Sequence, residues 1–483
     1  MLIQTFARLG AARAMFCGCI LCAGAMSHAS PDPGTDRAAS KAAIERMAQA
    51  LRIKTVSYQD PTQIDYVPFE AFLLFLRGSY PRVFANLKVE VFSSYSLLLH
   101  WPGSDASKLP VLFDAHYDVV PIEEGTAPAW QHPPFAGVVN GGYLWGRGAI
   151  DDKLAVIAYL EALEQLLAAG YQPARSLYFS LVHDEEIGGY QGAAVIARAL
   201  QARAIEFAFV VGEGGLVLQD AELLGGSDMA MIALAEKTYV TLHLRCSGEG
   251  GHASMPPRNN AAARLAAAVA RIHDNPAPAK LAPPVTDMLH EIGAQRGGLE
   301  GWLMRNTWLS GWWLKRKMAS DRSNNALLRN TAAITVLRSG IKENVVPQQA
   351  TAAVNLRLLP GVSVDDAVTY IKQTIDDAAI EVAVHSWGEG PPVANINGNG
   401  YQQIKRAIEH IYTGAAVVPG LMVATADTRH YQVLAQDVYR FRAYRLPLSD
   451  AAAVHGTNER LSVQSFSKAI AFSAELVREV GSP

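Results

Sequence analysis

The chain has 483 residues, of which 50% are apolar, and its acidic and basic residues nearly balance to a net charge of −3. This length predicts about two or three domains, and the apolar content is sufficient for a large core. The balance of charge, with no long basic run, argues against a protein that binds nucleic acid.

Residues 1–29 predict a secretory signal peptide. Arg8 and Arg13 precede an apolar run over residues 14–26, and Ser27 and Ala29 end it with small side chains of the kind that a signal peptidase reads. The run is short for a membrane span, which needs about 20 apolar residues, and an uncleaved anchor is the alternative. We therefore expect a secreted or periplasmic protein.

Cysteine use limits the covalent and metal chemistry expected of the mature chain, even though the chain is expected to act outside the cytoplasm. Three of the four cysteines lie inside the predicted signal peptide, so cleavage leaves only Cys246. The mature chain would then have no internal disulfide and no cysteine metal cluster.

After a breaker-rich linker at 30–36, strand-like and helix-like stretches alternate as far as residue 235, which we assign to the first part of a catalytic domain. This alternation predicts an α/β fold, in which a mainly parallel sheet is covered by helices on both faces. The expected strands are 111–115, 177–182 and 207–211, and the expected helices are 151–169 and 189–203.

The pattern changes at residue 236, where two helices and about four half-exposed strands predict an inserted α+β sandwich that extends to 387. A long insert at about 275–330 begins proline-rich and ends in GWLMRNTWLSGWWLKRK, with four of the eight tryptophans. Helices and strands of the first domain resume over 388–483. Within the sandwich, the expected strands are 239–246, 332–337, 351–358 and 380–385, the expected helices are 260–272 and 363–378, and a last helix follows at 462–480.

Ionisable residues gather at the ends of these elements. In VLFDAHYDVVP (111–121) an apolar strand leads to His116 and Asp118, which point the same way because they lie two residues apart on an extended chain. In GRGAIDDK (146–153), Asp151 opens a long helix. Each has an ordinary alternative, a loop histidine beside a solvated acid and a helix cap.

Two further clusters follow. LVHDEEIGG (181–189) ends a strand on three successive acids, which repel one another unless a cation is bound or all are solvated. One acid as ligand and another as general base is the division found in hydrolytic metal sites. In AAVHGTNERL (452–461), a small-residue strand is expected to lead to His455 just before the last helix.

A lone acid, Glu213, follows the apolar strand in FAFVVGEGG (207–215), and its ordinary interpretation is a turn residue facing water. Together the clusters place two histidines and several acids at the carboxyl ends of parallel strands, where such sheets hold their sites. Nitrogen and oxygen ligands without thiolate suit zinc, or else manganese or cobalt. Their number suggests two metals that share a bridging carboxylate.

These motifs, in this order, resemble the co-catalytic zinc family of aminoacylases, carboxypeptidase G and succinyl-diaminopimelate desuccinylase. The resemblance is greatest to carboxypeptidase S and its secreted N-acyl-amino-acid hydrolase relatives, and it covers nearly the whole chain after residue 29. It implies two zinc ions per chain and a ferredoxin-like lid or dimerisation domain at 236–387. By position it implies His116, Glu186 and His455 as zinc ligands, Asp151 as the bridge, Asp118 as the acid that orients His116, and Glu185 as the general base for the bridging water.

The inserted domain carries further motifs of the family. EKTYVTLHLRCSGEGGHASMPP implies that His252 stabilises the oxyanion, often in the active site of a partner subunit, with Asn344 of ENVVP as a second contact. NLRLLPG implies that Arg357 pairs with a substrate carboxylate. TADTRHY adds Arg429, as a further substrate contact, and His430. The same domain favours a homodimer, although the long insert could block that interface.

One departure from the family touches the metal site. The family usually has Asp-Glu-Gly where this chain has Gly212-Glu213-Gly214, and the missing Asp is a zinc ligand. Asn355 and Ala426 also replace residues that the closest relatives carry. We expect Glu213 to substitute as the ligand. The alternative is a zinc that binds weakly.

The motifs favour a two-zinc amidohydrolase that cleaves an amide bond next to a free carboxylate, as a carboxypeptidase or N-acyl-amino-acid hydrolase. A metal-poor relative that only binds such compounds, and a hydrolase with one tight and one weak metal, remain as alternatives. The tryptophan-rich stretch 302–313 is better explained as a core helix of the insert than as an apolar pocket or membrane-facing lip.

Overall fold

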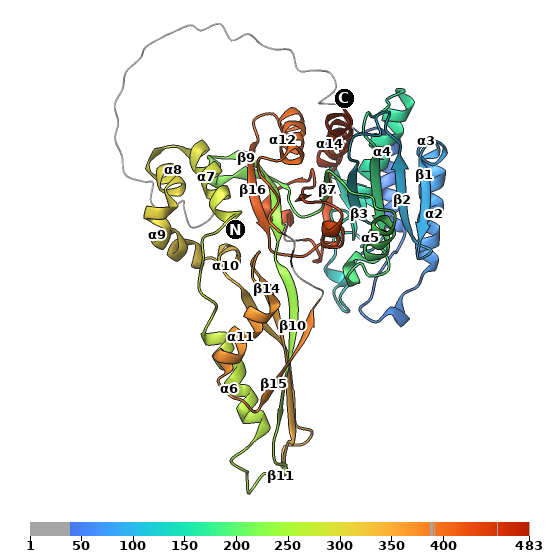
Figure 1. Cartoon of the computed structure of the whole chain (residues 1–483). Coiled ribbons are helices and arrows are strands. Elements are labelled where there is room, and N and C mark those ends of the chain that lie inside the picture. The colour runs from blue at the N-terminus through green and yellow to red at the C-terminus, as the bar shows by residue number, and fades with distance from the viewer. Residues whose placement is uncertain (1–38, 387–389, 391, 452, 483) are drawn as a thin grey trace.

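The computed structural model describes residues 39–386, 390, 392–451 and 453–482 (Figure 1). The predicted signal peptide lies outside these residues. No helix within the described ranges is long and apolar enough to cross a bilayer.

A ten-stranded sheet forms the centre of the larger part of the molecule, and the strands that precede the predicted site run parallel (Figure 1). These are β3 (Val111–His116), β6 (Leu177–Val182) and β7 (Phe209–Gly212). The expected α/β sheet is thus confirmed at its centre, with antiparallel pairs towards both edges. The remaining strands are β1 (Lys88–Phe92), β2 (Ser96–Trp101), β8 (Val217–Ala221), β9 (Ser227–Glu236), β16 (Ala416–Met422), β17 (Val438–Arg440) and β18 (Arg445–Leu446).

Both faces of this sheet are covered by helices, because its central strands are apolar on both sides. Val111 and Phe113 of β3 enter one core, whereas Leu112 between them enters the core on the opposite face. The first core is covered by α1 (Lys41–Arg52), α2 (Val67–Ser79), α3 (Pro81–Asn86), α4 (Lys153–Ala168), α12 (Asn399–Ile411) and α14 (Val463–Gly481), and the second by α5 (Ala193–Ala202).

A separate four-stranded antiparallel sheet has the order β12-β14-β10-β15 and carries two helices (Figure 1). Its elements follow one another as β-α-β-β-α-β, which is the ferredoxin-like arrangement. Asn260 and Ser363 cap its helices with their side chains. The elements are β10 (Thr238–Ser247), α6 (Ala261–Asp274), β12 (Thr331–Ser339), β14 (Gln349–Leu358), α11 (Val364–Ile375) and β15 (Ile380–Ser386), and a two-stranded ribbon of β11 (Gly251–His252) and β13 (Val345–Val346) extends from it.

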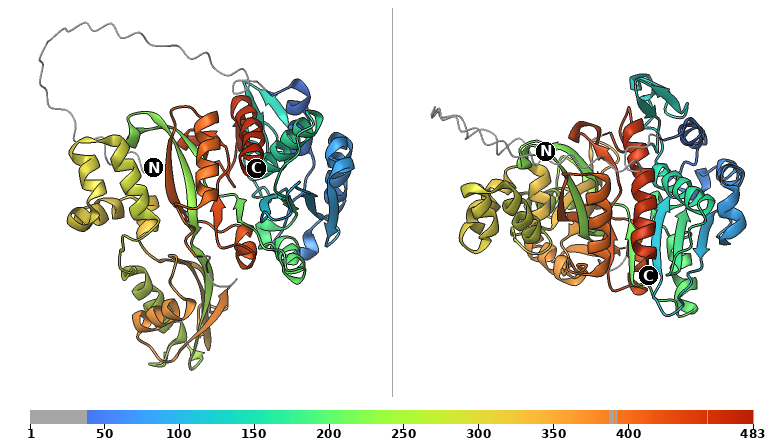
Figure 2. Two further views of the ribbon diagram at one scale, coloured as in Figure 1. Left: turned by 45° about the horizontal axis from the view of Figure 1, so that its top comes forward. Right: turned by 90° about the horizontal axis from the view of Figure 1, so that it is seen from above.

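The long insert folds into four helices that pack against the large sheet. Leu314 and Met318 share a core with Val418 and Leu421 of β16. In both views of Figure 2 these helices, in yellow, lie at the opposite end of the molecule from the blue N-terminal helices. They are α7 (Val285–Arg296), α8 (Gly298–Arg305), α9 (Thr307–Ala319) and α10 (Arg322–Leu328).

The prediction of a strand leading to His455 is wrong. The chain forms a short helix, α13 (Leu448–Ala451), and residues 453–458 form turns and bends. β19 (Arg460–Ser462) then pairs with β5 (Tyr143–Trp145), which itself lies beside β4 (Val138–Asn140). His455 has a φ of 60° and Asn458 a φ of 63°, and this left-handed backbone cannot continue a strand. The helix expected from residue 151 begins at Lys153, so Asp151 belongs to the preceding turn.

Candidate metal centre

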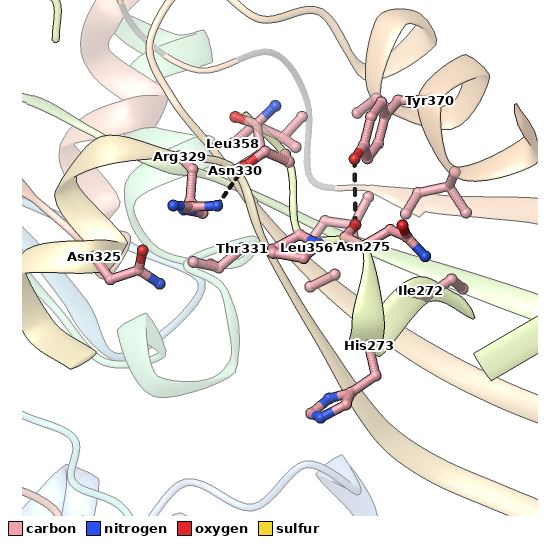
Figure 3. Close-up of a pocket in the computed structure, with 15 residues that line it drawn as sticks. Ile272, His273, Asn275, Asn325, Arg329, Asn330, Thr331, Leu356, Leu358 and Tyr370 are labelled. Atoms are coloured by element: carbon pink, nitrogen blue, oxygen red, sulfur yellow. Dashed lines mark hydrogen bonds between the residues drawn. The ribbon is translucent and has the colours of Figure 1, made fainter. Parts of the chain in front are cut away.

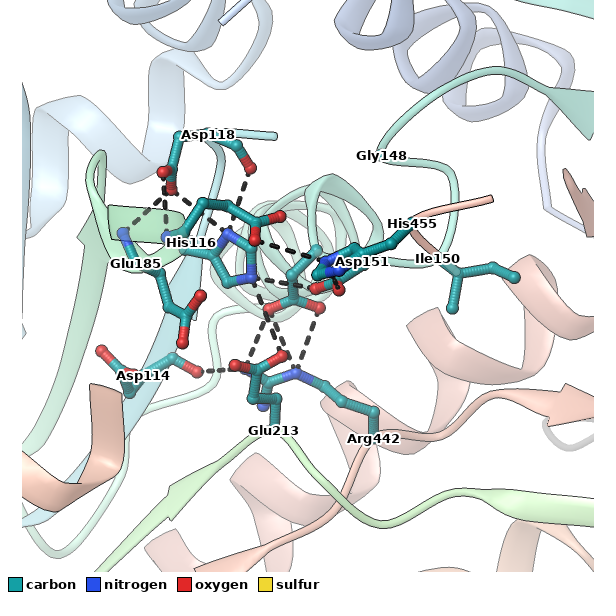
Figure 4. A network of polar contacts seen from close by, with 12 residues as sticks. Asp114, His116, Asp118, Gly148, Ile150, Asp151, Glu185, Glu213, Arg442 and His455 are labelled. Atoms are coloured by element: carbon teal, nitrogen blue, oxygen red, sulfur yellow. Dashed lines mark hydrogen bonds and ion pairs between the residues drawn. The ribbon is translucent and has the colours of Figure 1, made fainter. Parts of the chain in front are cut away.

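Six ionisable side chains from five segments of the chain meet at the carboxyl edge of the parallel strands (Figure 4). Parallel strands deliver their carboxyl ends to one edge, which is why segments far apart in sequence converge there. His116 ends β3, Glu185 and Glu186 follow β6, Glu213 follows β7, Asp151 precedes α4, and His455 precedes β19.

Asp151 lies between two sets of potential ligands. His116 Nε2 lies 3.0 Å from Asp151 Oδ1 and 3.7 Å from Glu213 Oε2. On the other side, His455 Nε2 lies 3.1 Å from Asp151 Oδ2 and 3.3 Å from Glu186 Oε2. Each set of three offers ligand atoms within 4.8 Å of one another, and the two sets share Asp151. This arrangement can hold two cations with one carboxylate between them.

Gly212 has no room for the acid that the family usually places there. A Cβ at this position would lie 2.0 Å from Cγ2 of Thr428, which is too close for any side chain unless Thr428 moves. Besides Asp151, the carboxylate of Glu213 also lies beside His116, and Glu213 and His116 form an ion pair. The geometry thus favours Glu213 over Gly212 as the position that serves this set.

The donor set fits divalent cations. Burial raises the pKa of Glu213, and it raises the pKa of Glu186 to about 7. Oε1 of Glu186 is buried without a hydrogen-bond partner among the described residues. Hydrogen bonds to Asp151 and Glu186 raise the pKa of His455 to about 10. Without metal, the site thus holds protons on groups that bind a metal in their deprotonated forms, and a cation of the kind that imidazole and carboxylate prefer relieves this conflict.

Asp118 fixes both His116 and the acidic turn beside it. It is fully buried, and its Oδ1 lies 3.3 Å from His116 Nδ1. Its two carboxylate oxygens accept the backbone N–H groups of Glu185 and Glu186, each at 3.2 Å. One carboxylate therefore sets the orientation of a ligand and the position of two functional acids.

Glu185 is a half-buried acid of this turn whose pKa is shifted upwards. Burial, followed by the charge of Glu213, raises its pKa well above the usual value. Its carboxylate lies between His116 and Asp114 in the view of Figure 4. A half-buried acid with a raised pKa beside a candidate metal site is suited to accepting and returning a proton.

Sequence analysis missed Glu459, which holds the turn of Asp151. This fully buried carboxylate accepts the backbone N–H groups of Gly148, Ile150 and Asp151 at 3.0, 2.8 and 3.2 Å, and it pairs with Arg147 at 2.7 Å. The available signal was an acid four residues after His455 in the motif HGTNE. The segment of one ligand thus positions the bridging candidate.

A second missed support lies beneath Asp151. Asp152, its neighbour, is buried and pairs with Arg442 at 3.0 Å, while Tyr444 donates a hydrogen bond to the same carboxylate. Arg442 also donates hydrogen bonds to the Tyr159 hydroxyl, at 3.2 Å, and to the backbone carbonyl of Asp114. A buried ion pair with this many hydrogen bonds fixes the local geometry.

Arg429 and His430 support the acidic turn from the other side. Arg429 is buried and donates to the carbonyls of Ala426 and Gly188, both at 2.7 Å. His430 Nε2 lies 2.9 Å from the carbonyl of Gly188, and burial lowers the pKa of His430 to about 4. Because Gly188 follows Glu186 closely, both side chains act here as supports of the turn.

Arg357 lies where the small sheet approaches the large one. Its guanidinium donates to Thr425 Oγ1 at 3.2 Å and to Asn355 Oδ1 at 3.3 Å, and it lies 4.6 Å from the ring centre of Tyr239. Burial lowers its pKa. Thr425 opens the TADTRHY motif, so Arg357 contacts the same loop that supports the acidic turn.

The structure does not bring His252 and Asn344 to the cluster of acids. Both are exposed and lie on the β11–β13 ribbon, where the backbone N–H of Ala253 donates to the carbonyl of Asn344. Figure 1 shows this ribbon at the far tip of the small sheet. They are adjacent to each other, as two partners for one oxyanion would need to be.

A hollow lies between α6, α10, α11 and the small sheet (Figure 3). Its lining includes His273, Arg329 and Tyr370 but no carboxylate. It therefore lacks the ligands of a metal centre and is separate from the cluster around Asp151.

Comparisons with known proteins identify a family. A family model for peptidase family M20/M25/M40 matches residues 112–479. The chain is 37% identical over 443 residues to N-fatty-acyl-amino acid synthase/hydrolase PM20D1 of Xenopus tropicalis, covering 91% of this chain and 86% of that protein. It is 34% identical over 440 residues to probable carboxypeptidase S-like 2 of Dictyostelium discoideum, covering 90% and 84%.

The fold is also that of solved structures. The M20 family metallo-carboxypeptidase Sso-CP2 from Sulfolobus solfataricus superposes with a TM-score of 0.68, covering 91% of this chain and 99% of that one. The sequence identity is 16%, so this likeness concerns the fold alone.

Proposed function

We propose, because the chain belongs to peptidase family M20/M25/M40 and is a hydrolase, that it cleaves an amide bond next to a free carboxylate with two zinc ions. The observation that carries this proposal is the pair of ligand sets that share Asp151, beside the half-buried Glu185 with its raised pKa. The bond in question is common to the substrates that the names of the two relatives suggest, a peptide C-terminus and an N-acyl-amino acid.

Zinc suits the donors because they are imidazole and carboxylate with no thiolate, and manganese or cobalt could occupy the same ligands. One set would hold the first ion through His116 and Glu213, the other would hold the second through Glu186 and His455, and Asp151 would serve both. Bound ions would polarise the scissile carbonyl and make water more acidic.

Glu185 is proposed as the general base. It accepts a proton from the attacking water and delivers it to the leaving nitrogen, and its raised pKa favours this return step. Asp118 keeps it in place through the backbone, so the base needs no side-chain hydrogen bond of its own to hold its position.

Arg357 is proposed to bind the carboxylate of the substrate, since its planar guanidinium matches a carboxylate in two-point geometry. His252 and Asn344 would stabilise the oxyanion, and their place at the ribbon tip requires either closure of the small domain or a second copy of the chain. We favour a homodimer in which the ribbon of one copy reaches the site of the other. We also propose that residues 1–29 act as a signal peptide, which is cleaved after residue 29 when the protein is exported.

The test combines metal analysis with a substrate panel. Dipeptides and N-acyl-amino acids should be hydrolysed, whereas the same compounds as carboxyl-terminal amides should not, and purified protein should hold about two zinc per chain. Arg357→Gln should raise KM for the free acids much more than it lowers kcat. A chain that binds these acids without turnover and holds no metal after reconstitution would be a binding protein, and this would refute the proposal.

Glu185→Gln separates the base from the ligands. We expect kcat to fall by about 10²- to 10⁴-fold with zinc content unchanged. Glu186→Gln, one residue on, is the matched control and should lower both zinc content and activity. Loss of metal in Glu185→Gln would assign Glu185 to the ligand set.

A further inference from the structure

Helix α9 (Thr307–Ala319) is apolar on two opposite faces. Leu314 and Met318 lie on the face that packs into the insert's core, together with the buried Ser310. The opposite face carries Trp308 and Trp312, which are 82% and 70% exposed. Because residues four apart share a helix face, these two indoles lie side by side along the outside of the molecule.

The neighbouring helix adds to this surface. Leu299 and Trp302 of α8 (Gly298–Arg305) are 73% and 42% exposed, and Leu309 of α9 is 49% exposed. We call these five side chains the tryptophan patch: Leu299, Trp302, Trp308, Leu309 and Trp312. Figure 1 and both panels of Figure 2 place the two helices at the outer edge of the helical lobe, away from the sheets. Several large exposed apolar side chains on two neighbouring helices are the kind of surface that usually marks an interaction site.

The charge around the patch is mainly basic. Residues 299–319, which span the patch, contain Arg305, Lys315, Arg316 and Lys317 and a single acid, Glu300, which forms an ion pair with Arg296, although the whole chain has a net charge of −3. Arg316 is exposed and lies on the same face of α9 as Trp312, because it follows Trp312 by four residues. Lys317 lies over Trp313, 4.9 Å from its ring centre.

From these observations we propose that the tryptophan patch docks the protein onto the surface of an anionic phospholipid bilayer. Indole rings prefer the boundary between headgroups and acyl chains, and a rim of lysine and arginine is attracted to anionic headgroups. A second copy of the chain fits less well, since a symmetric contact would bring two basic rims together. The docking is peripheral, because the patch belongs to helices that are already folded against the protein.

The test uses tryptophan fluorescence of the full chain with vesicles of phosphatidylcholine and phosphatidylglycerol whose acyl chains are brominated. Residues 1–29 contain no tryptophan, so insertion of that segment cannot produce the signal. We expect quenching with the anionic vesicles and much less with phosphatidylcholine alone. Vesicles that bind the protein without quenching its tryptophans would overturn the proposal, as would a failure to bind at all.

Matched variants locate the effect. Lys315→Gln/Arg316→Gln keeps every tryptophan and should weaken the vesicle affinity measured by quenching about tenfold or more. Lys405→Gln/Arg406→Gln removes two consecutive basic residues of α12, outside the patch, and should have little effect on the vesicle affinity. Equal losses of vesicle affinity in both variants would show that binding depends only on the net charge of the protein, and this would refute the tryptophan patch as the docking surface.

A second pair of variants tests the indoles by vesicle sedimentation. Trp308→Ser/Trp312→Ser should lower the bound fraction sharply, whereas Leu74→Ser/Ile341→Ser, at two other exposed apolar positions, should not. Hydrolysis of a soluble substrate should be unchanged in all four variants. If the indole variant binds as well as the wild type, or if it instead abolishes a concentration-dependent self-association of the protein, the bilayer is not the partner.

Discussion

Asp151 is the residue on which the candidate site depends most. Hydrogen bonds from His116 and His455 outweigh the effect of burial and lower its pKa well below the usual value. It therefore stays ionised, as a carboxylate that serves two cations must. Its position is in turn set by Glu459, which binds three backbone N–H groups around it.

Glu213 allows a direct test at the residue scale. Glu213→Gln should lower zinc content from about two towards one per chain, because it removes the only carboxylate besides Asp151 in the set of His116. Metal analysis after dialysis measures this directly. Glu222→Gln, at an exposed acid of the same segment, should keep full content. Two zinc ions and full activity in Glu213→Gln would show that Glu213 only supports the ligands.

At the scale of elements, the site depends on how strand ends fit against the turns that cover them. β7 ends at Gly212, directly under Thr428 of the TADTRHY turn. That turn also supplies the two side chains that donate to the carbonyl of Gly188. The close approach of backbone and turn explains a glycine at this position better than any need for a special backbone angle.

Gly212→Ala should destabilise the protein by about 1–3 kcal/mol, because the new Cβ would clash with Thr428 Cγ2 at 2.0 Å. Thr428→Ser removes that methyl group, so the double variant should recover most of the loss. Chemical denaturation of the two single variants and the double variant completes the cycle. A Gly212→Ala protein as stable as the wild type would show that Thr428 moves without cost.

The end of β6 makes a prediction about pH. His183 is buried between aromatic rings, its Nδ1 lies 2.7 Å from Ser96 Oγ, and burial lowers its pKa from 6.5 to about 4. The folded chain binds this proton less readily than the unfolded chain. The contribution of the neutral, buried His183 to the free energy of unfolding is therefore fully present above pH 6.5 and is lost as the pH falls to 4.

The variant His183→Phe removes this proton site. Between pH 6.5 and 4 the wild type should lose about 3 kcal/mol of unfolding free energy relative to His183→Phe. Urea denaturation at several pH values measures the difference. His290→Phe, at a side chain that is 60% exposed, is the control. A constant difference across the range would mean that His183 does not titrate as its burial implies.

The whole molecule joins three packed units, the large sheet, the small sheet and the helical lobe, and the metal centre lies in the first. Its candidate ligands come from segments between His116 and His455, so bound ions would link distant parts of the chain. Metal should therefore contribute to global stability as well as to activity.

Removal of metal by a chelator should lower the melting temperature, and added zinc should restore it, since a ligand at 1,000 times its Kd stabilises the folded state by about 4 kcal/mol. Asp151→Asn, which damages both ligand sets, should abolish the zinc-dependent shift. Asp220→Asn, at an exposed acid, should retain it. An unchanged melting temperature in the wild type after complete removal of zinc would contradict the proposed centre.

The order of elements was largely predictable, because strands buried on both faces are apolar throughout and helices show their own spacing. β3, β6 and β10 match the expected runs closely, and the helices expected to start at Asn260 and Ser363 do so, with these two residues as their caps. The segment before His455 was not predictable, since its small residues suit a strand as well as the turns that form.

The sequence by itself determined the chemistry of the site, because motif residues at strand ends must meet at one edge of a parallel sheet. Only the tertiary structure decided how the site is supported. Thr428 closes position 212, and Glu459 holds Asp151, through contacts between segments more than 200 residues apart. The same holds for the tryptophan patch: the sequence favoured a core helix, and packing decided that only one face of α9 is buried. Such contacts depend on the fold as a whole, so no local pattern encodes them.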